Sequence, residues 1–119
     1  MPLGNTHHQL HGYVHEVAQD VVERFGGAWN TYDGHGELSG HSEHQTFDIW
    51  GEGGRGDPLP EAQGDAMVAW LLGQRELTPL ALLIWWGWWW RPHIGWQPYP
   101  GWGGTHGPPY DAHIHVVVE

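Results

Sequence analysis

The chain has 119 residues, of which 39% are hydrophobic, and its 19 glycines and 9 prolines indicate one compact domain (1–119) with many turns. It contains no cysteine, which excludes disulfides, thiolate metal sites and a cysteine nucleophile. Its formal net charge is −10, from 4 Lys+Arg against 14 Asp+Glu, and argues against nucleic-acid binding, which requires a basic surface.

The sequence carries no signal for a membrane. No basic and then apolar leader opens the chain, so no signal peptide is visible. The longest apolar run, "LALLIWWGWWW", is too short to span a bilayer and ends at Arg91-Pro92. We therefore expect a soluble protein with no membrane partner.

The first predicted element is an amphipathic helix from Thr6 to Phe25. Its apolar residues recur at helical spacing, at Leu10, Val14, Val17, Val21 and Phe25. Acidic residues fall on the opposite face, and Gly26-Gly27 ends the helix. Four histidines follow its flank, His7, His8, His11 and His15. The last two have the spacing to share a metal, but we interpret all four as a solvated polar flank.

Two strands and a second helix follow. "AWNTY" (Ala28–Tyr32) and "TFDIW" (Thr46–Trp50) favour strands, and a histidine-bearing loop separates them. After a glycine-rich turn, Asp57-Pro58 suits a helix cap followed by the first helical position. The helix then runs from about Pro60 to Gly73, so helix initiation explains the "RGD" tripeptide better than adhesion does.

The last third of the chain is rich in tryptophan and glycine. "ALLIWWGWWW" predicts one central strand, and the segment from Arg91 to Asp111 predicts a long loop, of a length that is usually functional. "HIHVVV" predicts a closing strand on which His113 and His115 face one side. The order of elements predicts an α+β fold, in which two helices pack on a small antiparallel sheet.

The histidine-bearing loop and the strand after it contain several residues that could bind a metal ion. "GHGELSGHSEHQTFDIW" holds His35, His41 and His44 before Asp48. A catalytic zinc takes three protein ligands and keeps a fourth position open for water. One loop histidine, Asp48 and a histidine of the closing strand would supply that set. The alternative is that "HIHVVV" is simply a strand with polar residues on its solvated side.

The spacing resembles that of a known family. Ser39-Gly40-His41, Asp48 and His113-Ile114-His115 resemble the pattern of the zinc D,D-peptidases of the hedgehog-like superfamily (D-Ala-D-Ala carboxypeptidase type). The blocks "WNTYDGH", "DIWGEGGRGDPLP", "IWWGWWWRPHIGWQPYPG" and "HIHVVV" are similar to peptidase domains of actinobacterial and phage cell-wall lysins. The resemblance implies the hedgehog/D-Ala-D-Ala peptidase fold and one Zn2+ ion. It also implies hydrolysis of an amide bond in peptidoglycan stem peptides by metal-activated water, at the cell wall, by an extracellular enzyme or a phage enzyme released at lysis.

The resemblance also implies the metal ligands. It assigns Asp48 and His115 to zinc and leaves two alternatives for the remaining ligand. His41 has the spacing of the general motif, whereas His35 closes the "TYDGH" block of the lysin-like sequences. His44 stands where the family often has glycine, which suits a residue beside the metal or the substrate.

Catalytic residues follow from the same comparison. His113 is the expected hydrogen-bonding partner of the metal-bound water, and Asp111 orients it or serves as a base. Related sequences tend to read Asp-His-x-His, and Ala112 departs from that pattern. His106, upstream in the same loop, is a weaker candidate.

The ten tryptophans require a separate interpretation. Strand alternation predicts Trp86, Trp88 and Trp90 on one side of the sheet and Trp85 and Trp89 on the other, mostly packed in the core. The expected substrate contacts are Arg91, Trp96, Tyr99, Trp102 and Tyr110. Aromatic side chains can wall a cleft for a peptide or a sugar, and arginine binds carboxylates bidentately. The alternative functions are a non-catalytic zinc-binding domain and a Trp-rich domain that binds the cell wall.

Overall fold

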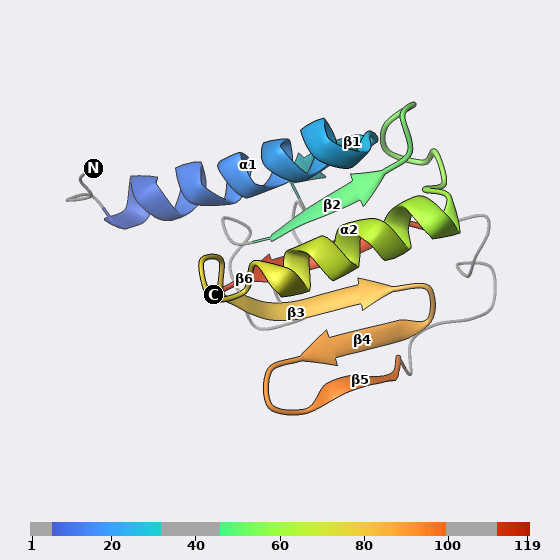
Figure 1. The fold of residues 1–119 in the computed structure, drawn as a ribbon. Coiled ribbons are helices and arrows are strands. Elements are labelled where there is room, and N and C mark those ends of the chain that lie inside the picture. The colour runs from blue at the N-terminus through green and yellow to red at the C-terminus, as the bar shows by residue number, and fades with distance from the viewer. Residues whose placement is uncertain (1–5, 32–45, 100–111) are drawn as a thin grey trace.

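The computed structural model describes residues 6–31, 46–99 and 112–119 (Figure 1). These residues form two helices and six strands: α1 (Thr6–Phe25), β1 (Ala28–Thr31), β2 (Thr46–Trp50), α2 (Glu61–Gly73), β3 (Leu80–Trp85), β4 (Trp88–Arg91), β5 (Gly95–Pro98) and β6 (Ile114–Val118). The predicted α+β class, with two helices on an antiparallel sheet, is confirmed. Within the described residues, neither helix has the combination of length and apolar character that a membrane span requires.

The strands form one antiparallel sheet in the order β1-β2-β6-β3-β4-β5. The closing strand β6 therefore lies between β2 and β3 and pairs with both. In this register Asp48 of β2 and Ile84 of β3 lie on either side of His115. Directly opposed residues of antiparallel strands project to the same face, so the register decides which side chains meet.

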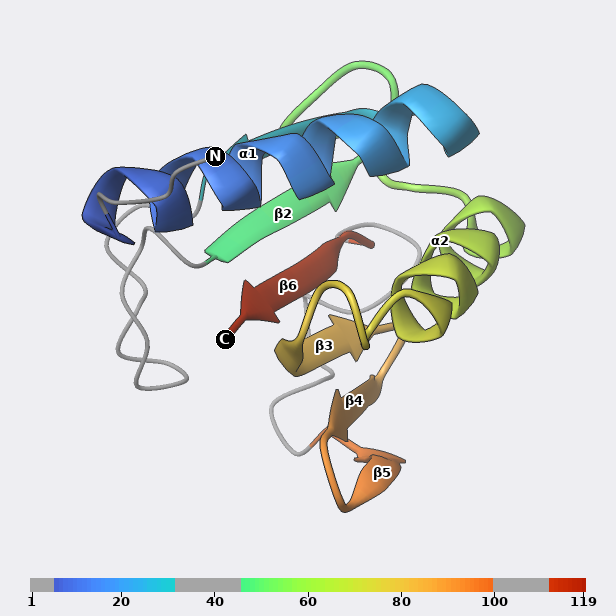
Figure 2. The same ribbon diagram turned by 60° about the vertical axis from the view of Figure 1, so that its left-hand side comes forward.

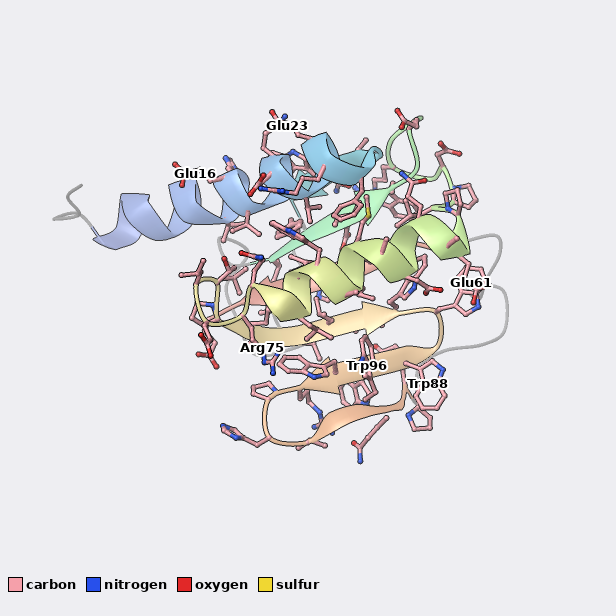
Figure 3. The ribbon with its side chains drawn as sticks, in the orientation of Figure 1. Glu16, Glu23, Glu61, Arg75, Trp88 and Trp96 are labelled. Carbon is pink, nitrogen blue, oxygen red and sulfur yellow. The ribbon has the colours of Figure 1, made fainter. Side chains whose placement is uncertain are left out.

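Both helices cover the same face of the sheet. α1 packs against β1 and β2, and α2 packs against β3, as Figures 1 and 2 show. The core between the layers is apolar and includes Val14, Val17, Val21, Phe47, Ile49, Met67, Leu71, Leu83, Ile114 and Val116. Glu16 and Glu23 of α1 are exposed on the side away from the sheet (Figure 3). Helical spacing of the apolar residues thus positions α1.

The other face of the sheet carries a different set of side chains. Leu82, Ile84 and Val117 form a small buried cluster on it, against which Trp89 and Tyr99 pack. Thr46, Asp48 and His115 are the buried polar residues of the described part of the chain, and alternation places all three on this face. The polar chemistry of the sheet is therefore separated from the helix-covered core.

The prediction of one central strand over "ALLIWWGWWW" was wrong. Trp86 and Gly87 both have positive φ, 54° and 87°, and form a two-residue turn between β3 and β4. The turn restarts the alternation, so Trp88 pairs with Trp85 and shares its face, while Trp89 projects to the opposite face. The predicted grouping of Trp85 with Trp89 on one side of the sheet fails for the same reason.

Two further expectations need correction. The predicted loop from Arg91 to Asp111 instead begins at the last residue of β4 and continues through a short turn into β5, which pairs with β4, and its remainder from 100 to 111 lies outside the described residues. The expected cap at Asp57 is also wrong, because α2 begins at Glu61 after Pro60. Asp57 Oδ2 instead accepts a hydrogen bond from the backbone N–H of Gly53 at 2.7 Å, closing the glycine-rich turn.

Candidate metal centre

Strands β2 and β6 bring Asp48, His113 and His115 together on the face away from the helices. Asp48 and His115 are direct partners in the register. The Nδ1 of His115 donates a hydrogen bond to Asp48 Oδ1 at 2.9 Å, and His113 Nε2 lies 4.0 Å from the same oxygen. His113 and His115 therefore lie on the same face of the sheet as Asp48, and their role as site residues stays a prediction.

Burial separates the three residues into two kinds. The side chains of Asp48 and His115 are 6% and 5% exposed, whereas the His113 side chain is 21% exposed. His113 lies just before β6, at the end of the cluster nearer to solvent. A polar pair in a buried site interacts more strongly than the same pair in water, because the surrounding protein screens it less. The buried pair of Asp48 and His115 is therefore suited to binding a metal ion. The more exposed His113 is suited to contacting a molecule that approaches from solvent.

Trp50 is part of this cluster, and the sequence reasoning did not include it. Its ring stacks on the His113 imidazole, with 4.2 Å between the centroids and 19° between the planes. Trp50 is two residues after Asp48 on β2, so the strand period alone puts both on one face. The strand period was therefore the signal in the sequence that could have identified Trp50. The stacking holds the plane of the imidazole.

The donor atoms of the buried pair fit a zinc ion. Zinc–ligand distances of about 2.0–2.2 Å in a tetrahedral arrangement place two donors about 3.4 Å apart. The observed 2.9 Å between Asp48 Oδ1 and His115 Nδ1 is shorter by about 0.5 Å, so a small side-chain rotation would exchange the hydrogen bond for two metal contacts. His and Asp are also among the ligands that zinc prefers.

The remaining ligand of the predicted zinc site is a histidine of the loop before β2. Among residues 6–31, 46–99 and 112–119 there is no group of three or more His, Cys, Asp or Glu that could hold a metal. The alternatives His35 and His41 lie outside the described residues, as does His44. The zinc site therefore stays a prediction, with two of its three ligands in a compatible position.

The expected substrate contacts divide between the two faces of the sheet. The guanidinium of Arg91 lies 4.1 Å from the Trp89 ring centroid and donates to Gln97 Oε1 at 2.9 Å. Trp89 and Tyr99 pack beside the small cluster on the face of Asp48. Trp96 pairs with Trp90 across β4 and β5, on the helix-covered side. Trp102, His106, Tyr110 and Asp111 lie outside the described residues.

The sequence was also compared with known proteins. A family model described as "VldE, C-terminal domain" matches residues 6–110. The match begins with α1, includes Asp48 and ends before His113 and His115. No curated protein and no solved structure matches the chain. Because the family match spans most of the 119 residues, the chain belongs to the VldE C-terminal domain family.

Proposed function

We propose that this protein is a zinc-dependent peptidase that hydrolyses an amide bond in peptidoglycan stem peptides. The observation that carries the proposal is the convergence of His113 and His115 on Asp48, in a buried patch between β2 and β6. The resemblance to zinc D,D-peptidases and wall lysins assigns chemistry to those same three positions. The fold proposed with it is the hedgehog/D-Ala-D-Ala peptidase type, and the place of action is the cell wall.

Three residues of the chain would bind the metal. Asp48 and His115 would bind one zinc ion, together with either His35 or His41. When bound, zinc supplies a Lewis acid for the scissile carbonyl and lowers the pKa of a coordinated water toward about 7. The sheet contributes rigidity, because Asp48 and His115 sit on paired strands and their backbones are held by the ladder.

His113 would carry the proton transfer at its Nε2 atom. This nitrogen lies 4.0 Å from Asp48 Oδ1, close enough to the buried pair to reach an atom bound there. Its greater exposure allows it to meet a peptide from solvent, and the Trp50 ring keeps the imidazole in one plane. A general base of this kind takes a proton from the attacking water and returns it to the leaving amine. Asp111 remains the proposed orienting residue.

Zinc analysis of purified variants tests the metal assignment. The wild type should carry about one zinc per chain, matching the single three-ligand site. Asp48→Ala and His115→Ala should lose it, whereas His113→Ala should keep it. His35→Ala and His41→Ala distinguish the two alternatives, since one of them should lose zinc. His93→Asn is a matched control, because His93 is exposed at positive φ, a conformation that Asn tolerates.

Hydrolysis is measured separately, as new amino groups released from purified peptidoglycan. The wild type and His93→Asn should release them, and His113→Ala should not, despite its zinc. Zinc bound by the wild type without any release of amino groups would favour the non-catalytic zinc-binding domain. Full zinc occupancy in both Asp48→Ala and His115→Ala would refute the site itself.

A further inference from the structure

A pocket lies on the helix-covered face of the sheet. A cavity of about 370 Å³ opens between the first turns of α2 and the β3–β4 hairpin. Its described lining is Glu61, Asp65, Val68, Trp85, Trp86, Trp88 and Trp96. Figure 3 shows Glu61, Trp88 and Trp96 gathered at this end of the molecule. We call this the tryptophan pocket. Trp85 projects to the helix side and Asp48 to the opposite side, so the pocket is distinct from the candidate metal centre.

The inner wall of the tryptophan pocket is held by two specific contacts. Trp85 lies directly against the backbone of α2 at Gly64, where an added Cβ would be 2.1 Å from ring atom Cζ2. The Nε1 of Trp85 donates a hydrogen bond to Asp65 Oδ1 at 2.9 Å. Glycine at this position and the neighbouring carboxylate therefore fix the indole in one orientation. Such preorganisation is typical of a binding site.

The rim of the pocket leaves large aromatic surfaces in contact with water. Trp88 is 48% exposed and Trp96 is 38% exposed. Trp86 occupies the first position of the hairpin turn at φ 54°, a conformation for which Asn and Gly are preferred and a bulky residue is an outlier. Exposed aromatic side chains around a cavity indicate a site for a partner or ligand. A purely structural turn has no need of tryptophan there.

The charges of the lining indicate what the ligand carries. Four indoles and two carboxylates line the pocket, and no Lys, Arg or His is among its described lining residues. The face of an indole attracts cations, and it does so more strongly when water is excluded. The chain uses this interaction elsewhere, where Arg24 and Arg91 lie over Trp70 and Trp89 at 4.9 and 4.1 Å from the ring centroids. Among its described lining residues, the tryptophan pocket has the indoles without a side-chain cation.

We propose that the tryptophan pocket binds an organic ammonium group, carried either by a quaternary amine or by a lysine-like side chain. The indoles would surround the cation, and Glu61 at the start of α2 would add an opposite charge beside it. Asp65 acts through Trp85, whose ring it holds. This binding needs neither zinc nor hydrolysis, so it stands apart from the proposed peptidase function.

Titration with matched small molecules tests the proposal. The probes are choline chloride, Nα-acetyl-lysine amide and 3,3-dimethyl-1-butanol, which is the uncharged carbon analogue of choline. The readout is the shift of the indole N–H signals in NMR spectra of the full chain as purified. At least one ammonium probe should shift the pocket indoles and bind about fivefold or more tightly than the neutral analogue. Choline and the lysine derivative distinguish the two sources of the ammonium group.

Variants assign the response to the pocket. Trp88→Ala and Trp96→Ala should each weaken ammonium binding by about fivefold or more, and their exposure makes folding of both variants expected. Glu61→Gln should weaken ammonium binding and leave the neutral analogue unaffected. Glu76→Gln is the matched control, an exposed glutamate in the turn after α2 that does not line the pocket.

Four outcomes would overturn the proposal. They are equal affinity for choline and its neutral analogue, no binding of either ammonium probe, unchanged binding in both tryptophan variants, and a stronger response to an N-acetylglucosamine oligosaccharide. The last would make the pocket a carbohydrate site. None of them depends on zinc content or amide cleavage, so the peptidase proposal is judged by its own experiments.

Discussion

Alanine in place of Gly64 should destabilise this protein, although alanine normally stabilises a helix interior relative to glycine. The intrinsic preference is worth about 1 kcal/mol per residue. Gly64 lies within α2, where that preference applies. The opposing effect is steric, since the new methyl group would meet three atoms of the Trp85 ring at 2.1, 2.4 and 2.6 Å.

The magnitude follows from how far the ring must move. Carbon atoms in contact lie about 3.5 Å apart, so the indole would retreat by about 1.4 Å. Trp85 is buried and its backbone pairs with Trp88, which leaves little freedom. Overpacking costs about 1–3 kcal/mol, and losing the hydrogen bond to Asp65 costs about 1 kcal/mol more. After the helix preference is subtracted, we expect Gly64→Ala to lower the free energy of unfolding by about 1–3 kcal/mol.

Urea unfolding followed by circular dichroism measures this change. Gly73→Ala is the matched control, because Gly73 ends the same helix and an added Cβ there meets nothing within 4 Å. The control should be neutral or more stable than the wild type by up to about 1 kcal/mol. If Gly64→Ala were as stable as the control, Trp85 would not be packed against α2 as described, and the inner wall of the tryptophan pocket would be wrong.

Three other substitutions, together with one control, test the sheet and its turns by the same unfolding measurement. Ile114→Ala empties a fully buried position on the central strand β6 and should cost about 2–5 kcal/mol, whereas a loss below about 1 kcal/mol would contradict its place in the core. Gly27→Ala puts a side chain at φ +97° and 2.7 Å from a β2 carbonyl oxygen, and should cost about 1–3 kcal/mol. Gly54→Ala has similar φ and open space, so an equal loss there would show that the clash is irrelevant. Asp57→Ala removes the acceptor of the Gly53 N–H and should cost about 1 kcal/mol, while an unchanged urea midpoint would mean that this hydrogen bond does not hold the turn.

The candidate metal centre was partly visible in the sequence. The spacing of His113 and His115 implies a shared face on any strand, and Asp48 lies in a segment with clear strand character. Which strands would be neighbours was not visible, because pairing between residues 48 and 115 is a long-range contact that local pattern does not encode. The stacking of Trp50 on His113 depends on that same register.

Local periodicity was sufficient where one face of an element is apolar and its ends carry clear stop signals. The limits of α1 at Thr6 and Phe25 and of β2 at Thr46 and Trp50 agree with the prediction. In both cases the alternation or helical repeat is unbroken, and in α1 glycines end it, so neighbouring residues alone specify the structure.

Tertiary packing decided the features that depend on residues distant in the chain. Placing β6 between β2 and β3 creates the polar patch at Asp48 and His115, and no local signal specifies that order. Tertiary packing also decides that the tryptophan run is divided by a turn at Trp86-Gly87. A continuous apolar run is consistent with one long strand or with a hairpin, and the pairing of β4 with β3 selects the hairpin. That choice turns Trp85 and Trp88 to the same face and creates the tryptophan pocket beside α2.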